Sequence, residues 1–270
     1  MTPLLEVRNI SKTYVRGGGV FADRAEGERF TALDGVSFEV AAGETFAIVG
    51  ESGCGKTTLA RILLRLIEPD SGNIWFDGQD LLHLAGGPLR AQRRKMQMIF
   101  QDPFASLNPR MKVGEIVAEP LVIHEHGHSS AERLRRAAEI LQHVGLDTSA
   151  LKRYPHEFSG GQRQRIGIAR ALILRPKLII ADEPVSALDV SVGAQVLRLL
   201  QELQQEFGLT FVFISHSLPV VAQLANQIAV MRAGKIVEAG AAERILRQPA
   251  ASYTKELLAA VPEIPRASQV

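Results

Sequence analysis

The chain has 270 residues, of which 46% are hydrophobic and 22% charged, so its length and composition are those of an ordinary globular protein with a sizeable core. Its formal net charge of +2 is too balanced for a dedicated nucleic-acid binder, and its single cysteine, Cys54, excludes an internal disulfide and a metal site made of cysteines alone. Since no stretch has the roughly 18 uncharged apolar residues of a membrane helix and the start has no signal-peptide layout, we expect a cytoplasmic chain that meets a membrane only through a partner.

The first segments predict two strands with a loop between them. Residues 4–10 alternate between apolar and polar side chains, which is typical of an edge strand. Tyr14 follows, and such an aromatic residue either stacks on a nucleotide base or, more often, belongs to the packing. Residues 16–30 hold four glycines among charged residues and indicate a loop or a loose hairpin, and residues 36–40 predict the second strand.

The next segment fits the phosphate-binding pattern G-x-x-x-x-G-K-[ST], and its residues are Gly50, Glu51, Ser52, Gly53, Cys54, Gly55, Lys56 and Thr57. The apolar residues 45–49 before it predict a buried strand, and apolar residues at helical spacing follow from Thr58 onwards. In this arrangement the backbone N–H groups and the start of the helix attract an anion. We expect Lys56 to reach the β- and γ-phosphates of a nucleotide and the Thr57 hydroxyl to ligate Mg²⁺. A chance glycine turn is the alternative, and the flanking segments argue against it.

A helical region interrupts the strands in the middle of the chain. Residues 90–95 form a basic run, which is typical of a solvated helix face, and residues 96–100 predict a strand that ends at Gln101. From residue 102 to about 157 the strand pattern disappears. The apolar stripe of an amphipathic helix in this region consists of Leu134, Ala138, Leu141 and Val144. We interpret residues 102–157 as a helical subdomain inserted into an α/β core.

Three alternate histidines in this region invite a metal interpretation. They are His124, His126 and His128, and they lie beside glycine and serine residues. No thiol or carboxylate cluster supports a metal site, so the segment is more typical of an exposed loop.

A helix start at residue 159 carries the second candidate anion site. Ser159 and Gln162 have the spacing of a capping box, which predicts Ser159 as the N-cap. Gly160 and Gly161 leave the first turn without side chains, and bare N–H groups at a helix start favour an anion.

Polar side chains follow several predicted strands. The apolar residues 178–181 lead into Asp182 and Glu183, and the strand at 209–214 leads to His216. In open α/β sheets ligands bind at the carboxyl ends of strands, so these residues and Gln101 are expected to converge. An Asp in this position typically holds Mg²⁺, and Glu183 is suited to orient or deprotonate a water that attacks the γ-phosphate.

The remaining segments complete the α/β pattern. Val192, Val196, Leu199, Leu200 and Leu203 predict the apolar face of a helix. Residues 227–231 and 235–238 indicate a hairpin around Gly234, and a helical tail follows.

With these motifs in order, the chain resembles the ATP-binding subunit of an ATP-binding-cassette (ABC) transporter over nearly its full length. The diagnostic segment is 158–162, which is similar to the LSGGQ signature with Phe158 in place of leucine. The resemblance also identifies residues 186–189 as the D-loop. Ser217 departs from the family, because an Asp usually follows the histidine that here is His216.

The resemblance implies a fold, a site and two cofactors, ATP and Mg²⁺. The fold is an α/β P-loop NTPase, an ABC-type nucleotide-binding domain with an antiparallel β subdomain and an inserted helical subdomain. Its expected parts are the core at 1–101 and 158–240, the insert at 102–157 and a helical tail at 241–270. The implied catalytic residues are Glu183, His216, Gln101 and Lys56, and the implied Mg²⁺ ligands are Thr57, Gln101 and Asp182. The implied nucleotide contacts are Tyr14 (stacked on adenine), Gly50, Glu51, Ser52, Gly53, Cys54, Gly55, Lys56, Thr57 and Thr58, and, across a head-to-tail dimer, Ser159, Gly160, Gly161 and Gln162.

A narrower resemblance is to the oligopeptide/dipeptide/nickel import group. Residues 100–111, 183–190 and 252–262 carry it, the second of these being similar to the second of the two ATPases that such importers commonly have. The resemblance implies two integral membrane permease subunits, a second similar ATPase or a second copy of this chain, and an extracytoplasmic solute-binding protein that acts indirectly. It places the chain at the cytoplasmic face of the inner membrane, as a peripheral subunit without nucleic acid.

Other functions remain as alternatives at this point. Within the transporter class, the cargo can be nickel or another small solute instead of peptide. An ABC ATPase acting on DNA or the ribosome is poorly supported, because the chain has one cassette and a compact insert. A module that binds nucleotide without hydrolysing it is disfavoured, because all the residues expected for hydrolysis are present, namely Lys56, Thr57, Asp182, Glu183 and His216.

Overall fold

The computed structural model describes residues 2–16, 28–125 and 127–260. By its contacts the chain divides into two compact units, one made of residues 1–84 and 214–270 and the other of residues 85–213. Each unit is described by itself. The expected boundaries at residues 101, 157 and 240 differ from this division and stay a prediction.

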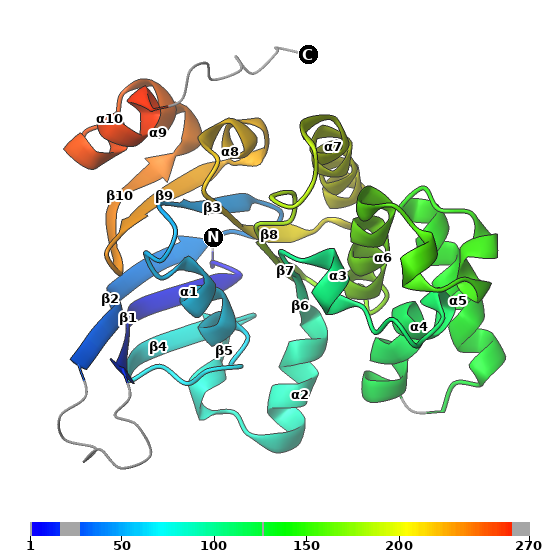
Figure 1. Ribbon diagram of the computed structural model, residues 1–270. Helices are drawn as coiled ribbons and strands as arrows, with labels where there is room; N and C mark the ends of the chain where they lie inside the picture. Colours follow the sequence, from blue (N-terminus) through cyan, green and yellow to red (C-terminus); the bar gives the residue numbers. More distant parts are fainter. Residues whose placement is uncertain (1, 17–27, 126, 261–270) are drawn as a thin grey trace. The chain divides into compact units, whose positions relative to one another are not determined.

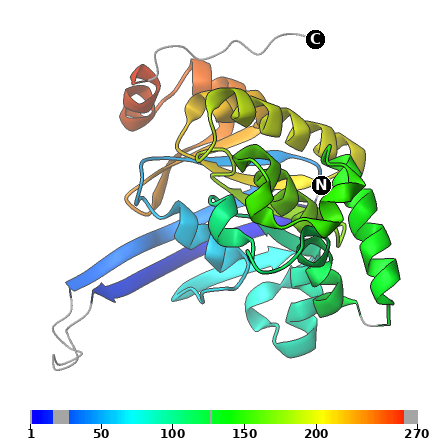
Figure 2. The same cartoon turned by 45° about the vertical axis from the view of Figure 1, so that its right-hand side comes forward.

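The first unit contains an antiparallel sheet of four strands in the order β2-β1-β4-β5. Its members are β1 (Leu5–Arg16), β2 (Glu28–Val40), β4 (Ser71–Phe76) and β5 (Gln79–Asp80). The long strands β1 and β2 lie side by side in both views (Figures 1 and 2). β1 has a partner on each side, so the expectation of an edge strand at residues 4–10 is wrong. Alternation reports which faces of a strand are buried and carries no information on its lateral neighbours.

The first unit also holds the strand that precedes the phosphate loop. All five residues of β3 (Thr45–Val49) are buried, and β3 pairs in parallel with β9 (Gln227–Arg232). β9 pairs antiparallel with β10 (Lys235–Ala241), which confirms the hairpin around Gly234. The helices of this unit are α1 (Lys56–Leu63), the 3₁₀ helix η1 (Leu81–His83), α8 (Leu218–Leu224), α9 (Ala242–Arg247) and α10 (Ser252–Ala259). β8 (Thr210–Ser215) runs across the division between the units.

The second unit combines a parallel strand pair with most of the helices. β6 (Met96–Ile99) pairs in parallel with β7 (Leu178–Asp182). Its α-helices are α2 (Gly86–Lys95), α3 (Pro103–Ser106), α4 (Val113–His124), α5 (Ser130–His143), α6 (Gly160–Leu172) and α7 (Val190–Phe207). The 3₁₀ helices η2 (Thr148–Lys152) and η3 (Pro155–Glu157) precede α6. The described residues between 102 and 157 hold helices and no strand, as the sequence predicts.

Helix α5 exists as expected, but its buried face differs from the predicted stripe. The buried residues are Ala137, Ile140, Leu141 and Val144, whereas Leu134 is 37% exposed. α4 and α6 both contact α5, and these neighbours decide which side of the helix is covered (Figure 1). No described helix has both the length and the apolar character needed to cross a bilayer.

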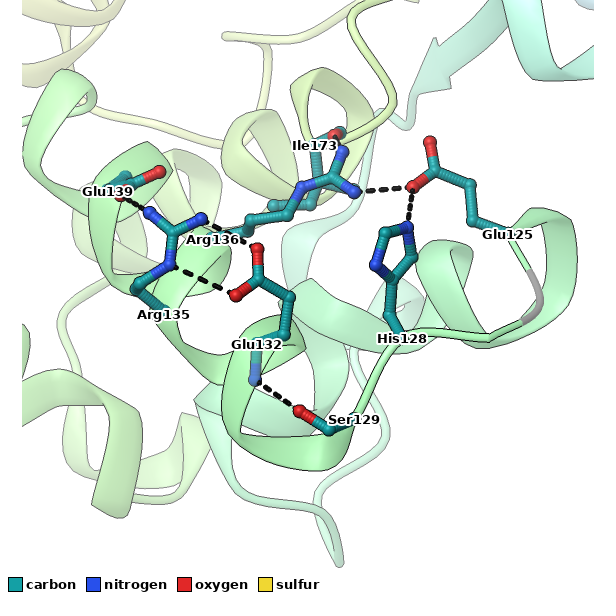
Figure 3. Close-up of polar contacts among 8 residues, drawn as sticks. All are labelled: Glu125, His128, Ser129, Glu132, Arg135, Arg136, Glu139 and Ile173. Atoms are coloured by element: carbon teal, nitrogen blue, oxygen red, sulfur yellow. Dashed lines mark hydrogen bonds and ion pairs between the residues drawn. The ribbon is translucent and has the colours of Figure 1, made fainter.

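One carboxylate holds three parts of the second unit together. Glu125 ends α4, its side chain is 10% exposed, and it accepts hydrogen bonds from Arg94 of α2 and Arg136 of α5. His128 Nε2 lies 3.2 Å from its Oε2 (Figure 3). Arg136 also donates to the carbonyl of Ile173 at 3.3 Å, so the same guanidinium reaches the end of α6. These contacts fix the turn between α4 and α5.

A second ion-pair group on α5 is exposed and serves as a contrast. Arg135 pairs with Glu132 and Glu139 along the helix surface, and Ser129 caps the helix by accepting from the Glu132 N–H at 3.1 Å (Figure 3). Ion pairs on a solvated surface add little to stability, whereas partly buried ones cost free energy when one partner is removed.

Replacing Glu125 with glutamine is therefore expected to destabilise the second unit. Burial raises the pKa of the Glu125 carboxyl. The hydrogen bond from Arg136 and the charges of Arg136 and Arg94 lower it by more than burial raises it, so the pKa lies below its ordinary value. We expect Glu125→Gln to lower the free energy of unfolding by about 2 kcal/mol at pH 7. Urea unfolding, with hydrogen exchange of α4 and α5 to localise the effect, measures this difference.

The lowered pKa of Glu125 also makes the difference in unfolding free energy between wild type and Glu125→Gln depend on pH. A depressed pKa contributes stability that is present above the unfolded value of about 4.3 and is lost as the pH falls through the folded value. The gap between wild type and Glu125→Gln is thus expected to narrow as the pH falls below about 4. Glu139→Gln is the matched control, since that carboxylate is 52% exposed. An equal loss in both variants, or a pH-independent gap, contradicts this account.

Candidate active site

The phosphate loop joins the buried strand β3 to helix α1, as the sequence predicts. Gly55 is the N-cap of α1, and no side chain caps the helix start. Glu51, Ser52 and Gly53 are exposed, whereas Cys54 is buried. The first N–H groups of an uncapped helix have no partner within the helix, so this exposed loop offers donors to an anion.

The Lys56 ammonium lies inside the loop. Its side chain is 5% exposed, and Nζ donates to the carbonyls of Gly50 at 2.7 Å and Glu51 at 2.8 Å. A buried charge needs such partners, because desolvation without them is costly. The loop backbone thereby curls around the ammonium and fixes where its charge sits.

Cys54 contributes packing to the loop. Burial raises the pKa of the Cys54 thiol, although the nearby Lys56 charge opposes the shift. The thiol form therefore prevails at neutral pH, and thiolate reactivity is suppressed.

Tyr14 lies on β1 opposite Phe30 of β2, and its side chain is 37% exposed. Lys12 Nζ lies 5.7 Å from the centroid of the Tyr14 ring and donates to Asp70 at 2.7 Å. The hydrogen bonds from Lys12 and from the Thr13 N–H hold the pKa of Asp70 below its ordinary value. An ion pair thus braces the strand that presents the ring, and the ring is partly open to solvent.

His216 follows β8 directly and is exposed. Ser217, the departure from the family pattern, is the N-cap of α8, and its side chain makes no capping hydrogen bond. Instead, the Ser217 N–H donates to the Ser215 hydroxyl at 3.0 Å. A hydrogen bond to the last residue of β8 therefore stabilises the turn at His216.

In the second unit the strand register brings Gln101 to Glu183. Ile99 of β6 lies opposite Ala181 of β7, so the residues two positions further along both strands are also neighbours. Gln101 Nε2 donates to Glu183 Oε2 at 3.3 Å. Asp182, between Ala181 and Glu183, is 4% exposed. The predicted convergence of polar groups at strand ends is confirmed for this strand pair.

The backbone at Glu183 has an unusual conformation. Its φ is 48°, in the left-handed region that non-glycine residues seldom adopt. The N–H and hydroxyl of Ser186 donate to the Glu183 carbonyl at 3.2 and 3.0 Å and hold the turn. Residues in this region of φ are often found at functional sites.

The expected capping box at the start of α6 is confirmed. The Gln162 N–H donates to Ser159 Oγ at 3.4 Å, and the Ser159 N–H donates to Gln162 Oε1 at 3.0 Å. A Cβ on Gly161 would lie 2.3 Å from Val192 Cγ1, so a larger residue at this position requires the Val192 side chain to move. Phe158 is buried under the Arg153 guanidinium, whose carbon lies 4.1 Å from the ring centroid.

The D-loop ends in a helix cap. Asp189 is the N-cap of α7, and its Oδ1 accepts from the Val192 N–H and the Ser191 hydroxyl at 2.9 Å each. These bonds hold the pKa of Asp189 below its ordinary value. Next to it, Val190 is 92% exposed.

Sequence reasoning missed the arginines that organise this region. Arg170 of α6 donates to the Ser106 carbonyl at 2.6 Å, and Arg163 donates to the carbonyls of Pro155 and His156. Burial lowers the pKa of Arg170. The available signal was an arginine within the otherwise apolar run at 168–172.

The site residues fall into both units. Tyr14, Gly50 to Thr58 and His216 belong to the first unit. Gln101, Asp182, Glu183 and Ser159 to Gln162 belong to the second. Among the described residues no group of three or more His, Cys, Asp or Glu side chains is arranged to hold a metal ion. His126 lies outside the described residues, and His128 is engaged with Glu125.

The sequence is closely similar to named transport ATPases. It is 52% identical over 261 residues to the "Putative peptide import ATP-binding protein" of Brucella ovis, an alignment that covers 97% of this chain and 79% of that protein. It is 51% identical over 260 residues to the oligopeptide transport ATP-binding protein OppF of Streptococcus mutans, covering 96% and 82%.

Solved structures agree with this similarity. The ATP-binding cassette MJ0796, solved as a dimer in a post-hydrolysis state bound to ADP and Pi, superposes with a TM-score of 0.76 at 32% identity and covers 88% of this chain and 98% of its own. The cbiO1 protein of Clostridium perfringens superposes with a TM-score of 0.77 at 26% identity and covers 92% of each chain. The family model described as "ABC transporter" matches residues 33–186, more than half of the sequence. The chain therefore belongs to the ABC transporter family, as one of its ATPases.

Proposed function

We propose that this chain hydrolyses ATP to drive a membrane importer of di- or oligopeptides. The observation that carries the cargo class is the 51–52% identity, over 96–97% of the chain, to proteins named for peptide import and oligopeptide transport. The import-group segments at 100–111 and 252–262 add to it.

In this proposal the first unit binds the nucleotide. The N–H groups from Gly50 to Thr58 surround the phosphates, and the exposed Tyr14 ring stacks on adenine. Lys56 has three N–H donors, of which two meet the carbonyls of Gly50 and Glu51 and the third lies 3.7 Å from Cys54 Sγ. Sulfur is a weak acceptor, so a phosphate oxygen can take its place at the ammonium.

The second unit supplies the hydrolytic groups. Glu183 orients or deprotonates the attacking water, and the Gln101 amide holds its carboxylate at the end of β7. His216, from the first unit, acts on the γ-phosphate through its imidazole. The chemistry is positioning and charge neutralisation rather than covalent catalysis.

The donor chemistry also fits Mg²⁺. Thr57, Asp182 and Gln101 offer a hydroxyl, a carboxylate and an amide oxygen, and oxygen ligands are those that Mg²⁺ prefers. Gln101 donates to Glu183 through its amide nitrogen, so the amide oxygen remains suited to a metal. When bound, the ion neutralises charge on the phosphate oxygens.

A complete site requires a second cassette. The start of α6, with the N-cap Ser159, the glycines 160 and 161 and Gln162, faces a nucleotide held by the partner ATPase, which is a second copy or a similar chain. The dimeric state of the solved relative MJ0796 supports this arrangement. The 92% exposed Val190, next to the D-loop, is suited to an interface.

The remaining assignments follow from the importer proposal. The core at 1–101 and 158–240 carries the nucleotide chemistry, and the insert at 102–157 transmits nucleotide state through Gln101. Residues 102–120 grip one of two permease subunits at the cytoplasmic face of the inner membrane, and an extracytoplasmic solute-binding protein delivers the cargo. In the tail at 241–270, helix α9 packs on β9 and β10.

The first test replaces the proposed base. Glu183→Gln keeps the shape of the side chain but removes its basicity, so we expect ATP binding and ATP-dependent dimerisation to persist while kcat falls by about 100-fold or more. Phosphate release and light scattering with ATP measure the two effects. Glu202→Gln, an exposed position on α7, is the matched control. Wild-type turnover in Glu183→Gln would remove Glu183 from this role.

The second test identifies the partners. Affinity purification of Glu183→Gln with ATP from detergent-solubilised native membranes is expected to recover two multi-span membrane proteins and a second, similar ATPase. Mass spectrometry identifies them, and omission of ATP is the control. Recovery of ribosomes, of DNA-repair proteins or of the chain alone would leave the ATPase chemistry intact and overturn the importer.

The third test addresses the cargo. A strain that lacks this chain is expected to lose uptake of a labelled tripeptide and to regain it when the wild-type gene is restored, but not with Glu183→Gln. Uptake of ⁶³Ni²⁺ is measured in the same strains. Loss of nickel uptake with unchanged peptide uptake would replace peptide by nickel as the cargo.

A further inference from the structure

The C-terminal helix α10 is anchored by a carboxylate from a distant strand. Glu238 of β10 has a side chain that is 6% exposed, and it accepts from the N–H groups of Ala250 at 2.9 Å and Ala251 at 3.1 Å. Ala251 is the N-cap of α10 and has no side chain suited to capping. Glu238 therefore holds the two residues immediately before the first turn of the helix, where its charge also favours the helix dipole.

The anchored helix places one large side chain against the hairpin β9–β10. Tyr253, in the first turn of α10, is 5% exposed. The guanidinium carbon of Arg232, the last residue of β9, lies 4.5 Å from the centroid of the Tyr253 ring. A buried aromatic ring covered by a guanidinium is a well-defined contact, since both groups are planar and rigid.

The same end of the hairpin contacts the phosphate loop. A Cβ on Gly50 would lie 2.2 Å from the Met231 carbonyl oxygen, so the two backbones touch there. The Gly234 N–H donates to the Cys54 carbonyl at 3.0 Å. Arg232, which carries the Tyr253 contact, lies between these two positions in the chain.

Tyr253 and the loop residue Glu51 also interact electrostatically. Burial raises the pKa of the Tyr253 hydroxyl, the backbone N–H of Glu51 opposes this shift, and the Glu51 charge adds to it. Glu51 is one of the two residues whose carbonyls hold the Lys56 ammonium. The electrostatic coupling therefore reaches the loop residue whose carbonyl holds the lysine, in addition to the backbone contacts through the hairpin.

We propose that Tyr253 is a positioning residue for the phosphate loop, held in place by Glu238 and Arg232, so that helix α10 sets the loop conformation that binds nucleotide. The ring supports the end of the hairpin through Arg232, and the hairpin backbone contacts the loop at Gly50 and Cys54. Loosening α10 widens the range of loop conformations, and nucleotide affinity falls because the binding conformation is less populated. The proposal rests on the loop as the nucleotide site and does not depend on the cargo.

The test measures ADP affinity of the full chain by isothermal titration calorimetry, which requires no hydrolysis and no partner. We expect Tyr253→Ala to weaken ADP binding about tenfold. Glu238→Gln weakens it less, and Tyr253→Ala with Glu238→Gln is expected to be no worse than Tyr253→Ala alone, because both act through one contact. Tyr253→Phe is expected to stay within about twofold of wild type, since the buried hydroxyl has no hydrogen-bond partner of normal geometry.

Lys255→Ala is the control, because Lys255 is exposed on the same helix. Thermal unfolding without nucleotide separates the proposal from a purely structural role of Tyr253. A lowered melting temperature with unchanged ADP affinity in Tyr253→Ala and Glu238→Gln would overturn the proposal. A loss in Tyr253→Phe as large as in Tyr253→Ala would overturn it as well. If Tyr253→Ala does not fold, Glu238→Gln decides.

The two proposals fail in different ways. If wild type and Lys255→Ala bind no ADP, the nucleotide site itself is misassigned and both proposals fail. If they bind ADP and the Tyr253 and Glu238 variants bind it equally well, only the role of Tyr253 is lost. KM for ATP is expected to rise in Tyr253→Ala with little change in kcat, because the variant alters binding and leaves Glu183 in place.

Discussion

A buried positive charge governs the shape of the phosphate loop. The Lys56 ammonium is nearly inaccessible to solvent, and desolvating it is tolerable only because the carbonyls of Gly50 and Glu51 turn inward to accept its hydrogen bonds. With the carbonyls turned towards the lysine, the exposed face of the loop is left to N–H groups. One electrostatic requirement thus produces both the curled backbone and the anion-binding surface, before any ligand is considered.

Local patterns predicted the groups that lie at strand ends. Buried strands are recognised in the sequence as apolar runs. We assigned Gln101 and Glu183, which follow two such runs, correctly to the same edge of the sheet, because the carboxyl ends of paired parallel strands lie side by side. The capping box of Ser159 and Gln162 was predictable for a similar reason, since both partners lie within one turn of chain. Features encoded within a few residues, or by strand direction alone, are readable from sequence.

Features that depend on a distant partner were not readable. The lateral position of β1 and the exposure of Leu134 depend on which elements pack beside them, and alternation or helical spacing carries no such information. Glu125 and Glu238 look like ordinary surface acids in the sequence, yet both are largely buried and hold segments that lie on other elements. The left-handed backbone at Glu183 likewise has no local signal, because no glycine marks it.

Three buried charged groups lie next to helix ends. Lys56 sits at the start of α1, Glu125 joins the end of α4 to α2 and α5, and Glu238 holds the start of α10. Their partners differ: Lys56 donates to loop carbonyls, Glu125 accepts from arginine side chains, and Glu238 accepts from the N–H groups just before α10. An apolar contact can slide, whereas a carboxylate or an ammonium with directed hydrogen bonds accepts few arrangements. Charged groups next to helix ends therefore restrict the orientation of these segments while the apolar core supplies stability. In our proposal the same restriction lets helix α10 set the conformation of the phosphate loop.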